Sequence, residues 1–376
     1  MKRKNLLLLI SFGFFAFCTN QSAAKTWRVN NKSNYNGTAL WGDNYGGTAA
    51  YPVFAQINQA VTFGIVNHGD TLHVEGSTSI YNFGTITKRL VIIGTGYFLT
   101  DNPATSNTTL STKIEYVVFN NNSQGSQLLG MDVVNNGNNA DGIVYVSVND
   151  ITVKRCRIER SVRFETLLTD AYIVQNFFAN TVNTNCLQTN GNNFFVPPTG
   201  IVFNNNICQK TLVWGTPLAN PTTLWPLSQC NNNVFDGPDN LATPNLAFST
   251  GEFGNNLLMP TNAVVNISAM PGVIAYNIGT LSTQFGTANN NLVVPAINSL
   301  FITSASRDGM YQVAAGSQAA GNGYDGTDRG AFGGAAITHR YTLSGLAHIP
   351  VIYQVNSAGV ADASGLPVQI KARIVN

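Results

Sequence analysis

The apolar positions of this chain fall into short pairs and alternations separated by polar triplets. Four six-residue segments align without gaps, and their starts lie 21, 29 and 27 residues apart. Each reads as an apolar residue, two or three polar residues and an apolar pair, which predicts a strand, a tight bend and a second strand. Repeats of about 20 to 50 residues are typical of solenoids. The segments are Val153–Ile158, Val174–Ala179, Phe203–Cys208 and Cys230–Phe235.

Asparagine occupies the predicted bends, as in Asn204–Asn206 and Asn231–Asn233. This residue tolerates the left-handed backbone region better than other residues that carry a side chain. Its amide can also hydrogen-bond to an equivalent amide one repeat away, across the strand spacing of about 4.8 Å. We therefore expect asparagine ladders, with ordinary surface turns as the alternative.

The repeat region needs covers at its open ends. Phe54, Ile57, Ala60 and Val61 stand at helical spacing and predict an amphipathic capping helix. Residues 71–74 and 90–93 then predict two short strands, because each run is rich in strand-forming residues and a glycine stands at one of its ends.

The pattern changes on the C-terminal side. The stretch Leu241–Ser304 lacks the asparagine triplets, and we expect a long insertion followed by irregular last coils. Ile349–Val355 and Leu366–Ile374 each alternate, which predicts a terminal β-hairpin or small sheet module. Such a module would cover the end of the repeats or attach the protein to a cell surface.

Motifs at both ends of the repeats point to a fold family. Near the N-terminal end stand a GDT-x-x-V strand and a K-x-L-x-I-x-G strand, formed by Gly69, Asp70, Thr71, Val74, Lys88, Leu90, Ile92 and Gly94. The tail 317–334 is similar to the SPA-x-x-x-G-x-D-x-GAF-G closing element of secreted bacterial β-helix proteins, with Gln318 in place of the usual proline. Residues 45–334 therefore resemble the pectate-lyase-like superfamily. This resemblance implies an all-β fold, a right-handed parallel β-helix solenoid, and no particular reaction, because the fold carries lyases, hydrolases, esterases and adhesins.

The predicted organisation has three parts. Residues 1–24 combine a basic start, an apolar run and a small-residue cleavage site, which predicts a secretory signal peptide. A lipoprotein anchored at Cys18 is the alternative. Residues 25–334 form the β-helix domain with its N-terminal cap, in about nine coils of about 25 residues. Residues 335–376 form the C-terminal β module, and we expect a monomer that is secreted or held at the cell surface.

Composition narrows the function classes. Charged residues make up only 10% of the chain, whereas 48 residues are asparagine. Without Lys2, Arg3 and Lys4 the mature chain has 17 basic and 18 acidic residues, so no basic field for nucleic acid remains. No later apolar stretch is long enough for a transmembrane segment. Metal-ligand spacing is lacking and the G-x-G-x-x-G match at 321–326 has no βαβ context, so we expect neither a metal nor a cofactor.

Four cysteines remain after export, at positions whose separations of 30, 22 and 22 residues are close to the repeat length. Export permits disulfides, and the sequence cannot choose among the three pairings. We favour the interpretation that these cysteines are small apolar core residues on stacked turns. The residues are Cys156, Cys186, Cys208 and Cys230.

One charged cluster stands out, with eight charges between residues 150 and 165. If Val153 and Cys156 point inward, Lys154, Arg157 and Glu159 point outward on adjoining strand positions. Such a strip can bind an acidic polysaccharide through its carboxylates, or supply the base of a lyase. An exposed salt-bridge ladder is the alternative that we favour.

Trp214 and Trp225 are further candidates, for stacking on sugar rings; the interpretation that we favour is that they anchor the cap or loops. The aspartates are scattered, so the two-carboxylate site of a glycosidase is not evident. We expect a glycan-binding or structural protein, with a polysaccharide lyase or glycoside hydrolase as the rival hypothesis. The candidate catalytic residues are Lys154, Arg157 and Glu159, and the candidate ligand-binding residues are Lys154, Arg157, Trp214 and Trp225.

Overall fold

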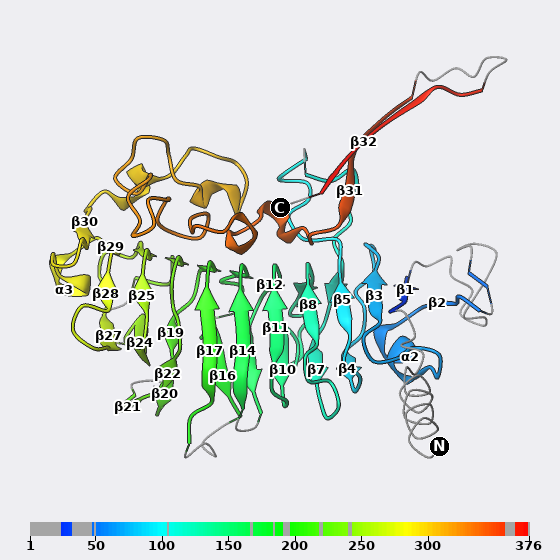
Figure 1. Cartoon of the computed structure of the whole chain (residues 1–376), viewed down its shortest axis with the longest axis horizontal. Helices are drawn as coiled ribbons and strands as arrows, with labels where there is room; N and C mark the ends of the chain where they lie inside the picture. The colour runs from blue at the N-terminus through cyan, green and yellow to red at the C-terminus, as the bar shows by residue number, and fades with distance from the viewer. Residues whose placement is uncertain are drawn as a thin grey trace, which may run out of the picture.

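The computed structural model describes residues 24–31, 47–48, 50–103, 105–165, 168–182, 185–190, 196–217, 221–239, 243–357 and 365–374. The predicted signal segment 1–23, with Cys18, lies outside the described residues. Within the described ranges, no helix combines the length and the apolar character needed to cross a bilayer. The strands follow one another along the long axis of the molecule (Figure 1).

Three parallel sheets make up most of the protein. The eight-stranded sheet has the order β17 (Thr199–Asn204), β14 (Thr169–Val174), β11 (Ile151–Lys154), β8 (Gln127–Leu129), β5 (Val91–Ile93), β3 (Thr71–Val74), β1 (Thr26–Val29) and β2 (Val53–Phe54). The five-stranded sheet has the order β16 (Leu187–Thr189), β13 (Ser161–Phe164), β10 (Ile143–Val146), β7 (Val117–Phe119) and β4 (Gly84–Ile86). The predicted all-β class with parallel strands is therefore confirmed.

The nine-stranded sheet runs nearly the full length of the repeats. Its order is β30 (Leu292–Val293), β29 (Ile278–Gly279), β26 (Leu257–Leu258), β23 (Val234–Phe235), β18 (Ile207–Cys208), β15 (Phe177–Phe178), β12 (Arg157–Ile158), β9 (Asp132–Val133) and β6 (Lys113–Ile114). The chain visits the three sheets in turn, as in the succession β11, β12, β13 and β14. Each residue of a strand thus meets an equivalent residue of the next repeat.

Smaller sheets continue the repeats toward the C-terminal side. They contain β19 (Leu212–Val213), β22 (Pro226–Leu227), β24 (Leu246–Thr250), β27 (Val265–Ser268), β25 (Phe253–Gly254), β28 (Ile274–Ala275) and the antiparallel pair β20 (Gly215–Thr216) and β21 (Thr223–Leu224). The expectation of a long insertion across 241–304 is therefore wrong. Asn256 and Asn277 continue the asparagine pattern through this region in shorter runs than the triplets.

An asparagine ladder runs through the core, as predicted. The Asn206 amide group donates to the Asn233 Oδ1 atom at 3.2 Å, and the Asn206 backbone N–H donates to the same atom at 2.9 Å. Each buried amide thus satisfies groups in two repeats, which an apolar residue of similar size cannot do. The ladder residues are Asn176, Asn206, Asn233, Asn256, Asn277 and Asn291, and Cys156 takes the equivalent place at one end.

A left-handed residue precedes each ladder position, with φ between 56° and 59°. These bend residues are Arg155, Gln175, Asn205, Asn232, Asn255, Tyr276 and Asn290. The register corrects one predicted repeat: Val153 pairs with Ile173, not with Val174. Ile173 is buried in the core, whereas Val174 points outward, so matching by apolar character alone shifted that segment by one residue.

The chain returns along the repeats after β30. We call residues 295–347 the return segment; it includes the 3₁₀ turns η2 (Ile297–Leu300), η3 (Gly309–Tyr311), η4 (Ile337–His339) and η5 (Leu343–Gly345). It runs back above the stacked strands, drawn in orange in Figure 1. Bend residues hold it: the Gln175 amide group donates to the Thr338 carbonyl at 2.7 Å, and the Asn205 amide group to the Ala331 carbonyl at 2.9 Å.

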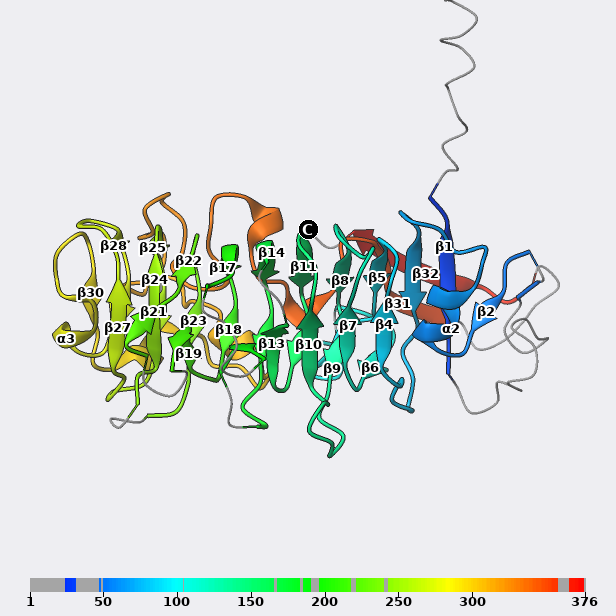
Figure 2. The same ribbon diagram turned by 90° about the horizontal axis from the view of Figure 1, so that it is seen from below.

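The two predicted terminal elements are present. Helix α2 (Ile57–Thr62) buries Ile57, Ala60 and Val61, as the apolar spacing predicted, whereas Phe54 lies outside the helix in strand β2. A one-turn helix, α3 (Ser282–Phe285), lies near the opposite end of the stack (Figure 2). Strands β31 (Pro350–Ser357) and β32 (Val368–Ile374) form the predicted antiparallel hairpin, which projects from the body (Figure 1).

All four cysteines of the described chain are buried free thiols, as favoured from their spacing.

Candidate functional site

A groove lies on the outer face of the eight-stranded sheet, with a volume of about 660 Å³. We call it the sheet-face groove. Side chains alternate along each strand, so that Val153 and Ile173 fill the core while their neighbours face outward. One outward row crosses four adjacent strands in register, at Gln127, Thr152, Tyr172 and Val202, and continues to Gln229, which pairs with Val202 through an isolated bridge.

The groove is lined by amides, hydroxyls, two valines, a lysine, a histidine and the ring of Tyr172. Tyr172 is 42% exposed at the centre of the outward row. Asn204 and Gln229 line the same groove, and the Asn204 amide group donates to Gln229 Oε1 at 3.0 Å. His339 of the return segment lines the groove from above. This surface offers both donors and acceptors next to an accessible ring.

Lys154 is the one Lys, Arg, Asp or Glu side chain among the residues that line the groove. Its ammonium group donates to the Thr338 carbonyl at 3.4 Å. Burial and, secondarily, the neighbouring Arg155 guanidinium lower the pKa of Lys154 from its ordinary value. The groove therefore carries a single cation whose proton is held less tightly than usual.

A second hollow, the charged cleft, lies outside the nine-stranded sheet and has a volume of about 580 Å³. Lys113, Asp132 and Arg157 stand in register on adjacent strands. The Arg157 guanidinium donates to Asp132 Oδ1 at 2.8 Å and to Glu159 Oε1 at 2.6 Å. The side chains of Arg157 and Glu159 are each only 12% exposed. Asp132, Arg157 and Glu159 therefore form a part-buried ion-pair triad.

Asp132 is the most buried member of the triad. Desolvation raises its pKa above the ordinary value, although the Arg157 charge and hydrogen bond act in the opposite direction. The cations of the cleft, Lys113, Arg157 and Arg307, are matched by Asp132, Glu159 and the Asp101 partner of Arg307. This balance gives a polyanion no net attraction.

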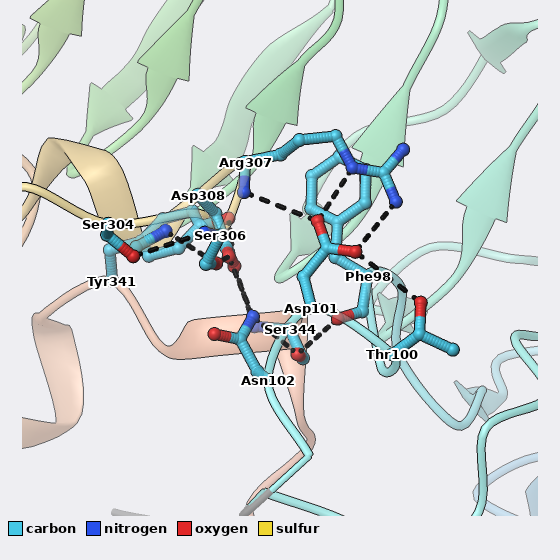
Figure 3. A network of polar contacts seen from close by, with 11 residues as sticks. Phe98, Thr100, Asp101, Asn102, Ser304, Ser306, Arg307, Asp308, Tyr341 and Ser344 are labelled. Carbon is cyan, nitrogen blue, oxygen red and sulfur yellow. Dashed lines mark hydrogen bonds and ion pairs between the residues drawn. The ribbon is translucent and has the colours of Figure 1, made fainter.

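The wall of the charged cleft joins an early loop to the return segment (Figure 3). The Arg307 Nε atom donates to Asp101 Oδ2 at 2.7 Å, and the guanidinium stacks over the Phe98 ring at 4.0 Å. These contacts span about 200 residues of sequence, and through Arg307 the return segment supplies one part of the cleft wall.

Asp308 is the buried centre of the same network (Figure 3). Its Oδ1 atom accepts from the Asn102 amide at 2.8 Å and from the Ser306 hydroxyl at 2.7 Å. Its Oδ2 atom accepts from the Ser344 backbone N–H at 2.7 Å and from the Tyr341 hydroxyl at 3.3 Å. Hydrogen bonds from both chain segments thus stabilise the carboxylate away from solvent.

The predicted strip of Lys154, Arg157 and Glu159 does not form one face. The left-handed bend at Arg155 places Lys154 on the eight-stranded sheet and Arg157 on the nine-stranded sheet. Lys154 therefore lines the sheet-face groove, whereas Arg157 and Glu159 line the charged cleft. The expectation of a common outward strip was wrong because it treated the bend as continuous strand.

The hypothesis that Trp214 and Trp225 stack on sugar rings is also wrong, because both side chains are buried. Their side chains are 0% and 3% exposed, and their rings contact each other edge to face at 5.0 Å. Neither ring reaches a surface on which a sugar can stack. Tyr172 is the exposed aromatic residue that the sequence reasoning missed, although its place in the alternating run 169–174 carried a signal.

Comparison with protein-family models, with curated proteins and with solved structures gives no match. Among the described residues, no three His, Cys, Asp or Glu side chains gather as metal ligands would. The sheet-face groove and the charged cleft are therefore the two candidate sites at which this protein could bind a ligand.

Proposed function

We propose that this chain is a secreted or surface-associated right-handed parallel β-helix protein that binds a glycan in the sheet-face groove. The observation that carries the proposal is the outward row in which the exposed Tyr172 ring stands between Thr152 and Val202, with Gln127 and Gln229 at the two ends of the row. The order in which the chain visits the three parallel sheets supports the β-helix assignment. The resemblance of the sequence to secreted β-helix proteins supports export.

Sugar recognition suits this lining. A sugar ring presents apolar C–H groups on its faces and hydroxyls around its rim. An exposed tyrosine can stack against the face, while Gln127, Thr152 and Gln229 exchange hydrogen bonds with the hydroxyls. Because the sheet fixes the backbone of each of these side chains, little loop ordering opposes binding.

Retention on immobilised polysaccharides tests the proposal. We expect Tyr172→Ala to weaken retention at least tenfold with no change in the unfolding midpoint, because the ring is exposed. Tyr51→Ala is the matched control, since Tyr51 is also exposed but lies away from the groove. Equal retention of Tyr172→Ala and the wild type on every polysaccharide that binds would exclude this site.

A lyase is the second candidate function, and the lowered pKa of Lys154 favours it. A lysine whose proton is loosely held is suited to abstract the proton beside a uronate carboxylate. Incubation with acidic polysaccharides should then release an unsaturated product, and Lys154→Ala should abolish release while retention persists. Retention with no product from any substrate leaves binding as the function of the groove.

A further inference from the structure

A third hollow, of about 490 Å³, follows the sheet-face groove toward the C-terminal end of the stack. We call it the tyrosine hollow; its lining includes Asn231, Glu252, Tyr276 and Tyr324. Tyr324, from the return segment, is 60% exposed. Its ring lies 6.3 Å from the Tyr276 ring at a steep angle of 68°. The hollow thus has an aromatic wall and a hydrogen-bonding floor.

Hydrogen bonds between neighbouring repeats connect the residues of the hollow to those of the groove. The Asn231 backbone N–H donates to Asn204 Oδ1 in the groove at 2.8 Å, while the Asn231 amide group donates to Glu252 Oε2 at 3.0 Å. The Cys230 N–H donates to the Glu252 carbonyl, which places Glu252 in the row that follows Gln229. The outward row therefore continues from Gln229 in the groove to Glu252 in the hollow.

Tyr276 occupies a bend where an aromatic residue is unfavourable. Its φ of 58° lies in the left-handed region, where asparagine stands in the bends at Asn205, Asn232 and Asn255. A bulky side chain costs about 1 kcal/mol or more in this conformation. The Tyr276 ring lies next to Tyr324 and 5.7 Å from the Arg329 guanidinium, and backbone strain of this kind is concentrated at functional sites.

We propose that the groove and the hollow form one track that binds a single polysaccharide chain across the strands, along the long axis of the protein. From the strand of Gln127 to the strand before Tyr276 the track crosses six strand spacings, about 29 Å at about 4.8 Å each. Tyr172 stands two strand spacings from the Gln127 end, and the Tyr276–Tyr324 pair stands at the other end. The ligand is therefore a polymer of several sugar units.

The charges of the track favour an uncharged glycan. Lys154 stands in the groove and Glu252 in the hollow, so the track carries one cation and one carboxylate. A densely carboxylated chain would gain a contact with Lys154 but would place further carboxylates near Glu252. Neutral hydroxyls meet no such repulsion and hydrogen-bond with both groups.

This inference rests on the proposed glycan-binding function, and chain-length dependence separates the two. The probes are disaccharides to hexasaccharides of β-1,4-glucan, β-1,4-mannan and β-1,4-xylan, with oligogalacturonates as the charged counterpart, measured by calorimetry. We expect the hexasaccharide of at least one neutral series to bind at least tenfold more tightly than its trisaccharide. In Tyr324→Ala the hexasaccharide should bind no more tightly than the trisaccharide, whereas the affinity for the trisaccharide should equal that of the wild type.

Tyr276→Asn is the second variant, because it restores the residue that the other bends use. We expect it to fold with an unchanged or higher unfolding midpoint and to lose the same gain with chain length. An unaltered length dependence in both variants overturns the track while leaving the groove. If oligogalacturonates bind more tightly than every neutral series, the inference that the ligand is an uncharged glycan is wrong. If none of the probes binds, both the track and the proposed function are contradicted.

Discussion

The Arg155 guanidinium donates a hydrogen bond of 2.8 Å to the carbonyl of Leu346, which lies 191 residues later in the chain. Arg155 is a bend residue and Leu346 belongs to the return segment. The same relationship recurs at Gln175 and Asn205, which also bind backbone carbonyls of that segment. The repeats therefore present their bends as a docking edge for the return segment, which borders both the sheet-face groove and the charged cleft.

The asparagine ladder should contribute strongly to stability. We expect Asn233→Ala to lower the free energy of unfolding by about 2–4 kcal/mol, because it leaves the buried Asn206 N–H and the Phe203 carbonyl without partners. Urea unfolding followed by circular dichroism measures the change. The exposed Asn121→Ala serves as the control, and a shift no larger than that of the control would contradict a structural ladder.

The return segment should depend on the buried Asp308 carboxylate. We expect Asp308→Ala to cost about 2–4 kcal/mol and to increase protease cleavage between residues 300 and 345, because four donors lose their acceptor. Asp101→Ala removes an ion pair with the largely exposed Arg307, and its cost should stay within about 0–1 kcal/mol. Equal protease sensitivity of the two variants would be inconsistent with Asp308 as the anchor.

The four cysteines should react only after unfolding. All four are free and buried, so a thiol reagent added to the native mature protein should label none of them. Addition after denaturation without reductant should label all four. Fewer than four labelled thiols in the denatured protein would mean that disulfides form in solution.

Alkaline pH should destabilise the protein through these thiols. Burial raises the pKa of Cys156 to about 12. An unfolded thiol ionises near pH 8.5, so between the two pKa values the unfolded state binds fewer protons, and stability falls as the pH rises. The loss is about 1.4 kcal/mol per pH unit for such a group. Cys156→Ala should lose less stability than the wild type between pH 8.5 and 10.5, and parallel pH profiles would refute this explanation.

The sequence predicted those parts of the fold that depend on local spacing. The asparagine triplets predicted the ladder because each ladder residue repeats in the same local context. The shorter Asn255–Asn256 pair, followed by two leucines, carried the same signal within 241–304 and was missed because the pattern there is incomplete. The hairpin was predictable because Ile352 and Ile370 belong to clear alternating runs.

The candidate site could be predicted only in part. Lys154, Arg157 and Glu159 are adjacent in sequence, but the bend at Arg155 divides them between two sheets. Tyr172 faces outward because of the register of β14, which follows from the pairing of Ile173 with Val153. Contacts of the return segment join residues far apart in sequence, so no local pattern indicates them.

Footprinting of Tyr172 tests the central claim most directly. Hydroxyl-radical oxidation of the wild-type protein would be compared with and without a polysaccharide that it retains, with Tyr51 as the exposed reference outside the groove. Glycan binding in the sheet-face groove predicts that oxidation of Tyr172 falls severalfold while oxidation of Tyr51 is unchanged. Unchanged oxidation of Tyr172 in the presence of the retained polysaccharide would contradict the account, because the glycan would then lie outside the sheet-face groove.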